Sequence, residues 1–283
     1  MLMLAARSLI RVMPTHAATR LATALASRTQ RPEVKAHEKE IMNGASAIRY
    51  GPRLLNTAWS WGSGPLVILV HGWNGRASQL AILAKSIADA GYRAVAIEVT
   101  GHGASPGSRT GWATFMQDIA ALTSSLQSDV HGFVGHSAGG LALMAARRTR
   151  GINAKRWVCI AAPSYPFPPV VAISKRLAPP KRVIERYQDY LASQFETQWE
   201  PLAKGSSFEG AGENLLLIYD EDDRYINHLE ADRIKEICTG ARVMKTRGTS
   251  HSRVLAAPEV CSAVVGFLAE RQGDSTDASR KLG

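Results

Sequence analysis

Along the chain, short continuous apolar runs alternate with longer segments in which apolar residues recur with helical spacing. Continuous apolar runs bounded by Gly, Pro or polar residues predict strands that are buried on both faces. The predicted strands are residues 45–50, 54–61, 66–70, 92–99, 130–134, 156–161, 214–219 and 241–246. The predicted helices are residues 77–90, 114–126, 141–148, 229–238 and 259–271. This alternation predicts an α/β fold with a mostly parallel central sheet and helices on both faces.

Residues 163–211 interrupt the alternation, because they contain no predicted strand. The segment opens with PSYPFPP and continues with helical stretches at 170–177 and 181–195. It follows a central strand, and ligands bind beyond the carboxyl ends of parallel strands, so we expect a helical cap there; a peripheral helix pair is the alternative. The expected divisions are a helical arm (1–44), a core in two parts (45–162 and 212–272), the cap (163–211) and a disordered tail (273–283).

The arm is basic, because no acidic residue precedes Glu33 and arginines are spaced through Leu and Ala. This pattern is typical of amphipathic helices that dock on the domain or lie on a membrane surface. It is also typical of a mitochondrial transit peptide. No apolar run approaches the roughly 20 residues that span a bilayer. We expect a cytoplasmic protein, with membrane association or organelle targeting through residues 1–33 as the alternatives.

The chain has 283 residues and a net charge of +10, and the first 60 residues carry nine Lys/Arg against three Asp/Glu. A second basic cluster is formed by Lys175, Arg176, Lys181, Arg182 and Arg186. No nucleic-acid-binding signature accompanies either cluster, so we predict a solvated basic surface and no nucleic-acid partner.

The three cysteines, Cys159, Cys238 and Cys261, lie in apolar segments and have no zinc spacing. We expect buried thiols in a reducing compartment and no metal site.

A candidate catalytic motif lies in VGHSAGGLALM, residues 134–144, where Gly135, Ser137 and Gly139 form a Gly-x-Ser-x-Gly motif. Such a motif is weak alone, because small residues also gather in ordinary tight turns. Here an apolar strand precedes it and an Ala/Leu-rich helix follows it. That setting is typical of a nucleophile elbow, in which a strained turn presents the serine at a helix N-terminus.

A serine hydroxyl needs a base, and the base needs an orienting acid. His251 lies in RGTSHSRVL after the strand at 241–246 and is the predicted base. Asp220, Asp222 and Asp223 in DEDDRYI compete for the acid role, and Asp223 is favoured because it falls in the loop beyond the strand. Ser…Asp…His is the chain order of one lineage of catalytic triads.

The loop HGWNGRAS follows the strand at 66–70 and contains two glycines. The expected oxyanion-hole donors are the backbone N–H groups of Trp73, in this loop, and Ala138, directly after the serine. His71 and His102 are interpreted as turn scaffolding, and His136 as a pocket residue that is not the base. No substrate-binding residue is predicted from the sequence.

Together these motifs resemble those of the α/β-hydrolase superfamily from about residue 54 to residue 268. HGWNG resembles its oxyanion loop, GHGASPG its Gly-His-Gly-x-Ser turn, GHSAGG its nucleophile elbow, DEDDRYI its acid loop and GTSHSRV its histidine loop. Asp220 stands where the family commonly has glycine, and the alignment still gives Asp223 as the acid. HGWNGRASQ with DEDDR is similar to poorly characterised bacterial hydrolases with an N-terminal helical arm.

The resemblance implies a serine hydrolase that cleaves carboxylic esters through an acyl-enzyme, with no cofactor. A serine at 137 argues against the aspartate-nucleophile chemistries of the superfamily, dehalogenation and epoxide hydrolysis. The expected partner is a small-molecule ester or thioester. A thioesterase or acyltransferase with the same triad is the alternative, followed by a binding protein without activity on the same scaffold.

Overall fold

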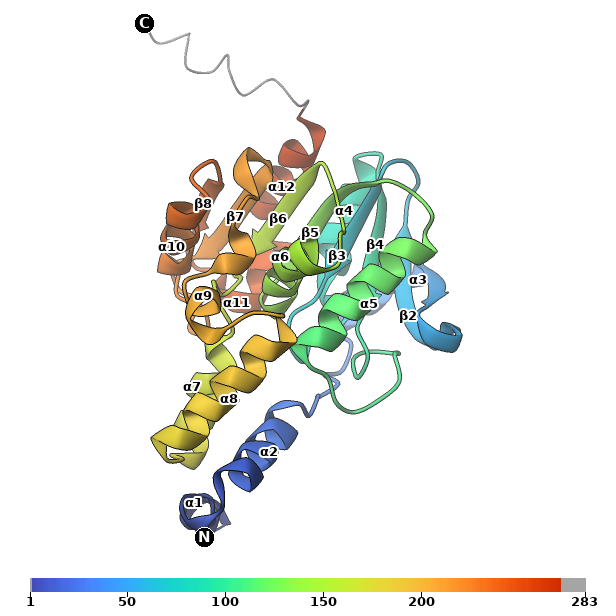
Figure 1. The fold of residues 1–283 in the computed structure, drawn as a ribbon. Helices are drawn as coiled ribbons and strands as arrows, with labels where there is room; N and C mark the ends of the chain where they lie inside the picture. The colour runs from blue at the N-terminus through green and yellow to red at the C-terminus, as the bar shows by residue number, and fades with distance from the viewer. Residues whose placement is uncertain (1, 271–283) are drawn as a thin grey trace, which may run out of the picture.

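The centre of the molecule is one eight-stranded sheet (Figure 1). The computed structural model describes the backbone of residues 2–270 and the side chains of residues 7–270. The strands run in the order β1-β2-β4-β3-β5-β6-β7-β8; β2 is antiparallel to β1 and β4, and the other neighbours are parallel. They are β1 Ser46–Tyr50, β2 Asn56–Trp61, β3 Leu66–Val70, β4 Arg93–Glu98, β5 Val130–His136, β6 Arg156–Ile160, β7 Leu215–Asp220 and β8 Arg242–Thr246.

Helices cover both faces of this sheet. The helices of the described residues, including those that lie beyond the end of the sheet, are α1 Leu2–Val12, α2 Thr15–Ala26, α3 Ala36–Asn43, α4 Ala81–Asp89, α5 Trp112–Ser125, α6 Ala138–Thr149, α7 Phe167–Leu177, α8 Lys181–Gln194, α9 Trp199–Ala203, α10 Leu229–Ile237, α11 Ser250–Arg253 and α12 Pro258–Ala269. In β3, Ile68 and Val70 belong to the core cluster shared with α5 and α6, whereas Val67 and Leu69 belong to the cluster shared with α4 and α12. Burial on both faces explains why this strand is apolar throughout.

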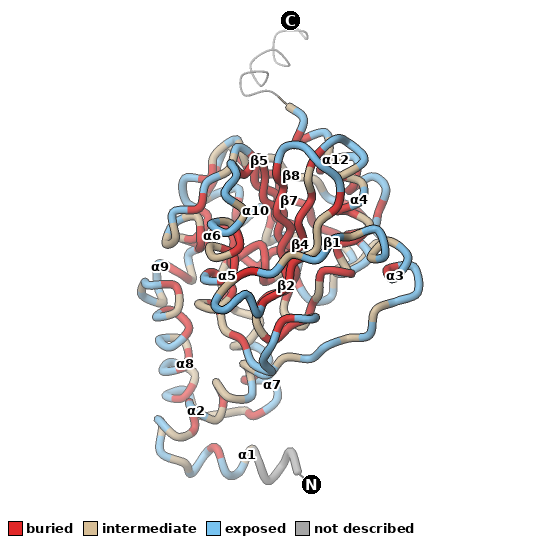
Figure 2. The backbone as a smooth tube through the Cα atoms, turned by 90° about the vertical axis from the view of Figure 1, so that its right-hand side faces the viewer, coloured by how far each residue is buried: buried red, intermediate tan, exposed pale blue. Residues whose placement is uncertain are grey.

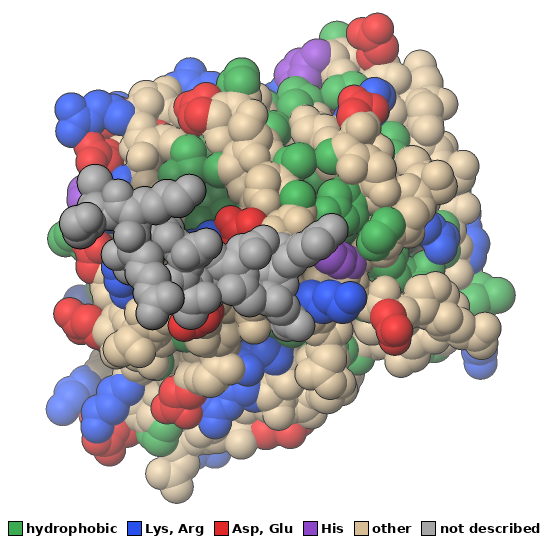
Figure 3. Space-filling model, turned by 90° about the horizontal axis from the view of Figure 1, so that it is seen from above, with side chains coloured by type: hydrophobic (Ala, Val, Ile, Leu, Met, Phe, Trp, Pro, Cys, Tyr) green, Lys and Arg blue, Asp and Glu red, His purple; other side chains and the backbone are tan. Residues whose placement is uncertain are grey.

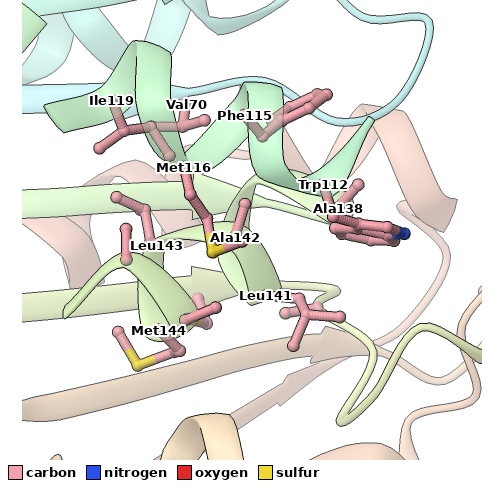
Figure 4. Close-up of a cluster of buried hydrophobic side chains, with 14 of the residues drawn as sticks. Val70, Trp112, Phe115, Met116, Ile119, Ala138, Leu141, Ala142, Leu143 and Met144 are labelled. Atoms are coloured by element: carbon pink, nitrogen blue, oxygen red, sulfur yellow. The ribbon is translucent and has the colours of Figure 1, made fainter. Parts of the chain in front are cut away.

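The core on one face is built around α5 and α6, which contact each other, and in Figure 4 Met116 of α5 points toward Ala142 of α6. Phe115 and Met116 from α5 belong to the same buried cluster as Leu141 and Leu143 from α6, and all four are fully buried. Burying an apolar side chain of this size stabilises the fold by about 1.5–3 kcal/mol. This packing fixes the N-terminus of α6, where Ser137 lies.

The predicted fold class is confirmed, whereas several element boundaries predicted from the pattern are wrong, among them the starts of β2 and α6. β2 begins at Asn56 because Arg53 and Leu54 have φ angles of 56° and 55°, in a tight turn that joins it to β1. The helix predicted at 141–148 begins at Ala138, because Gly139 and Gly140 continue the helix. These two glycines made the helical pattern harder to recognise in the sequence, but the close approach of neighbouring backbone at this point requires them.

Residues 163–211 form α7, α8 and α9, and α7 and α8 lie at one end of the molecule (Figure 1). The sequence pattern missed α9. It also placed the start of α7 too late, because Pro168 and Pro169 are tolerated in the first turn, where the backbone N–H groups have no helical partner. The described residues of this segment contain no strand, as expected.

The N-terminal helices pack against this segment: α1 contacts α7, and α2 contacts α8. Arg7 donates hydrogen bonds to the carbonyl oxygens of Lys175 (2.8 Å) and Arg176 (3.0 Å) at the C-terminal end of α7. Arg182 of α8 donates to the Thr15 hydroxyl (3.1 Å) and to the carbonyl of Arg11 (3.2 Å). These bonds join two segments that lie far apart in the sequence.

After α2 the chain runs along the outside of the molecule to α3, as Figure 2 shows. The N–H of Thr29 donates to the carbonyl of Ser108, and the buried Glu38 accepts a 2.7 Å bond from the Ser78 hydroxyl. Residues 1–44 therefore contact three separate parts of the domain.

Among the described residues no single helix is long and apolar enough to cross a membrane; one pair bent by 60°, Ser250–Ala256 with Pro258–Ala269, meets that test by length and composition. The expected disordered tail at 273–283 lies outside the described residues.

Candidate active site

Ser137 occupies a sharp turn between β5 and α6. Its φ and ψ angles are 52° and −122°, and its N–H donates a 2.8 Å hydrogen bond to the carbonyl of Ile160 on β6. A residue other than glycine with positive φ is strained, typically by about 1–3 kcal/mol, and such strain clusters at functional sites. The turn places the hydroxyl at the N-terminus of a twelve-residue helix.

The glycines of the motif are required because neighbouring backbone approaches closely. A Cβ atom on Gly139 would lie 2.5 Å from the carbonyl oxygens of Val70 and His71, and one on Gly135 would lie 2.5 Å from the Cα of Gly140. The loop after β3 thereby reaches Ser137: a Cβ on Gly72 would lie 3.0 Å from the serine Cβ.

His251 and Asp223 are joined by a short hydrogen bond. The His251 Nδ1 lies 2.6 Å from the Asp223 Oδ2, and the aspartate side chain is only 1% exposed. The other carboxylate oxygen, Oδ1, accepts from the N–H groups of Tyr225 (2.7 Å) and Ile226 (3.0 Å). Because an ionised carboxylate only accepts, Nδ1 carries the proton, and the Nε2 of a neutral ring is left as an acceptor.

Asp220, an alternative candidate acid, fixes the loop that carries His251 instead of contacting its ring. Its carboxylate accepts bonds from the hydroxyls of Thr246 (2.9 Å) and Thr249 (2.7 Å) and from the N–H groups of Thr249 (3.0 Å), Ser250 (2.9 Å) and Asp222 (3.0 Å). Burial raises the pKa of Asp220, but these bonds together outweigh it and lower the pKa from 3.8 to about 2. The sequence placed Asp220 in the correct loop and gave no signal for this role.

We expect Asp220→Ala to destabilise the protein by about 3–5 kcal/mol, because five donors lose a buried anionic partner. Denaturant titration at neutral pH measures this loss. Asp222→Ala is the matched control, because that side chain is exposed and accepts one bond, from the N–H of Gly248; its cost should stay within about 1 kcal/mol.

The same carboxylate predicts an acid dependence of stability. Its pKa in the folded protein is depressed, so its contribution is complete above pH 4, falls as the pH drops toward 2, and amounts to about 2 kcal/mol. The stability difference between the wild type and Asp220→Asn should therefore narrow between pH 4 and pH 2. A difference that stays constant over this range would contradict the assignment.

His136 contacts the His251 segment from the other side. Its Nε2–H donates a 2.8 Å bond to the backbone carbonyl of His251, and the two ring centroids lie 4.8 Å apart. Burial and the neighbouring His251 lower the pKa of His136 to about 3, so the ring is neutral. His136 is not among the residues that line the cavity with Ser137, so its interpretation as a pocket residue is wrong, and its contact with the histidine backbone was not foreseen.

The backbone N–H groups of Trp73 and Ala138 have no acceptor among the described residues, and both residues line the same cavity as Ser137 and His251. The loop that carries Trp73 is held by buried histidines. The N–H of Val99 donates to the His71 Nε2, and the N–H of Asn74 donates to the His102 Nε2, both at 3.2 Å. Burial lowers the pKa of His71 to about 3 and of His102 to about 4, so both are neutral scaffold groups.

The hydrogen bonds of the described residues include none between the Ser137 hydroxyl and the His251 imidazole. Both residues face one cavity of about 1070 Å³. In unliganded enzymes such bonds are often long and form when substrate binds. The structure thus brings Ser137, Asp223 and His251 to one place and forms the Asp223–His251 bond.

The cavity is lined by segments from the whole length of the chain. The arm contributes residues 23 and 25–30, α7 and α8 contribute mostly apolar side chains, and Arg224 and Tyr225 come from the acid loop. Its charged lining residues are Arg28, Lys175, Arg176 and Arg224, all of them basic. No sequence signal pointed to the arm as part of the cavity wall.

Cys159, Cys238 and Cys261 are buried free thiols, as predicted. Within the described part of the chain, no group of three or more His, Cys, Asp or Glu side chains could hold a metal ion.

Comparison of the sequence with known families finds that residues 67–264 match the model described as "Alpha/beta hydrolase family". Over 84 residues the chain is 39% identical to the non-heme chloroperoxidase CPO-A1 of Kitasatospora aureofaciens. This match spans 28% of the chain and 30% of that relative.

Solved structures with the same fold include enzymes named for different reactions. A Pyrococcus furiosus esterase matches with a TM-score of 0.62 and 18% identity, over 85% of this chain and 98% of that one. A Vigna radiata epoxide hydrolase (TM-score 0.59, 17%) matches over 80% and 99% of the two chains, and a Bacillus anthracis bromoperoxidase (0.60, 19%) over 80% and 100%. At these identities the likeness concerns the fold alone.

Proposed function

Since the chain belongs to the α/β-hydrolase family, we propose that it is a serine hydrolase that cleaves carboxylic esters through an acyl-enzyme. The observation that carries the proposal is the 2.6 Å bond between His251 and Asp223, at a cavity also lined by Ser137. Solved structures with this fold are named for different reactions, so these side chains, and not the fold, support the proposal.

The proposed reaction begins when the Ser137 Oγ attacks the ester carbonyl and the His251 Nε2 accepts the hydroxyl proton. Asp223 holds Nδ1 protonated and stabilises the imidazolium that forms. His251 then protonates the leaving alkoxide as the carbonyl reforms, which leaves an acyl group on Ser137. A water molecule, deprotonated by the same Nε2, attacks the acyl-enzyme and releases the carboxylic acid.

We assign the stabilisation of the negative charge of each tetrahedral intermediate to the backbone N–H groups of Trp73 and Ala138. Neither N–H has an acceptor in the part of the chain that the structure describes, which supports this role, because an N–H already bonded to the protein could not stabilise an oxyanion. Each such donor typically lowers the barrier by about 2.7–4 kcal/mol.

The cavity favours substrates with a large apolar part. Its volume of about 1070 Å³ lies at the upper end of ordinary ligand pockets, and its walls include Phe167, Ile173, Leu191 and other apolar side chains. The exclusively basic charged lining favours an anionic group on the substrate. An acyl ester with an anionic leaving part fits both properties.

The test of the proposal is covalent labelling by a fluorophosphonate probe, followed by peptide mapping. We expect a single adduct on Ser137 that forms in the native protein and not after unfolding. No adduct on the native protein, or an adduct on another residue, would overturn the assignment. A panel of p-nitrophenyl esters, acyl-thioesters and acceptor alcohols then separates ester hydrolysis from thioester hydrolysis and acyl transfer.

A further inference from the structure

We propose that the end of the molecule formed by α1, α2, α7 and α8 docks on an anionic lipid surface, so that the mouth of the cavity faces that surface. These four helices lie together at the end opposite the described C-terminus in both Figures 1 and 2. We call this end the basic pole. It is defined by residues 7–31 of the arm and residues 167–194.

Most of the net charge of the chain lies at the basic pole. Residues 1–31 contain five Lys/Arg and no Asp/Glu, and residues 167–194 contain five Lys/Arg and two Asp/Glu, so these segments supply eight of the ten net positive charges. The opposite end, seen in Figure 3, has acidic side chains among its basic ones. The fold therefore gathers two separate basic segments on one surface.

Exposed apolar side chains occupy the same pole. Val12 is 80% exposed and Leu9 is 54% exposed, although the neighbouring Ile10 is fully buried against the domain. Leu25, Val171 and Tyr190 are also exposed. Basic residues combined with exposed apolar residues on amphipathic helices are the features that bind helices to a lipid interface.

The cavity reaches this pole. Leu25, Val171, Lys175 and Tyr190 are exposed, and each also lines the cavity that contains Ser137. A surface bound at the pole would therefore face the cavity mouth.

A lipid surface fits this pole better than a nucleic acid or an acidic protein does. Phosphate contacts alone account for basic residues but give no reason to expose Val12 and Leu9 beside them. A bilayer with anionic headgroups accepts both, because apolar side chains insert while Lys and Arg bind headgroups.

The experiment measures co-sedimentation of the Ser137→Ala protein with vesicles, so that lipid is not consumed and the result is independent of the proposed activity. We expect binding to an equal mixture of phosphatidylcholine and phosphatidylglycerol, weakened by salt, and at least about tenfold weaker binding to phosphatidylcholine alone. Equal binding to both vesicles, or none to either, would overturn the proposal.

The variant Lys175→Glu/Lys181→Glu/Arg186→Glu tests the pole itself. These exposed side chains donate no hydrogen bond to the arm among the described residues, so the arm should stay docked. Vesicle binding should fall at least about tenfold. The matched control, Lys39→Glu/Lys155→Glu/Lys235→Glu, changes the net charge equally at exposed sites elsewhere and should keep most of the binding.

The variant Leu9→Ser/Val12→Ser removes the apolar part and should also weaken binding several-fold, whereas Leu55→Ser/Leu229→Ser at other exposed sites should not. Equal loss in the variant and control pairs would overturn the proposal. So would duplex RNA that competes the protein off the vesicles and binds the Leu9→Ser/Val12→Ser variant as tightly as the parent, because the pole would then be a polyanion site.

Discussion

Ser137→Ala should reduce kcat for p-nitrophenyl ester hydrolysis by at least about 10⁴-fold. Without the hydroxyl no acyl-enzyme forms, and the remaining rate would come from binding and oxyanion stabilisation alone. The fold should be retained, because Ala and Ser are equally strained at a φ of 52° and the Ser137 N–H bond to Ile160 is a backbone bond. Steady-state kinetics and thermal unfolding of the same preparation check both expectations.

Ser252→Ala is the matched control for this variant. Ser252 lines the same cavity and directly follows His251, yet the proposed reaction gives it no role. Its kcat should stay within about threefold of the wild type. A Ser137→Ala protein with wild-type-like turnover, or an equal loss in Ser252→Ala, would contradict a nucleophilic Ser137.

The strands and the loops that carry the candidate catalytic residues could be predicted, because each of them is recognised from a short stretch of sequence. LVILV at 66–70 is apolar throughout because the sheet is covered on both faces, and the structure buries all five residues. GHSAGG predicted the turn at Ser137 because glycine is required wherever backbone approaches this closely. Parallel topology then places the loops after β5, β7 and β8 at one edge of the sheet.

The chain could not reveal contacts made by segments far apart in sequence. That residues 23 and 25–30 help line the cavity follows from how α2 packs on α8, and the sequence of neither helix indicates this partner. Asp220, Asp222 and Asp223 are three aspartates of one loop, so the sequence does not distinguish their roles. Only the direction of each side chain shows which one anchors the loop and which one contacts the histidine. The bond between His136 and the His251 carbonyl likewise depends on the relative placement of β5 and α11.

Asp223→Asn should lower kcat by about 10⁴-fold with little change in stability. The reason lies in the hydrogen bonds that this side chain accepts. The N–H groups of Tyr225 and Ile226 both point at Oδ1, so the amide oxygen of an asparagine must take that position. Its NH₂ group then faces the His251 Nδ1, which must become the acceptor. The proton moves to Nε2, and the ring can no longer accept the Ser137 proton.

Asp222→Asn provides the matched control, because among the described residues the exposed Asp222 carboxylate accepts only from the N–H of Gly248. Its kcat should stay within about threefold of the wild type. Nitrogen-15 NMR of the His251 ring adds a readout that a merely structural effect would not produce. In the wild type the protonated nitrogen should be Nδ1, and in Asp223→Asn it should be Nε2. If Asp223→Asn keeps both the wild-type tautomer and the wild-type rate, Asp223 does not orient the histidine, and the acid of the site must be sought elsewhere.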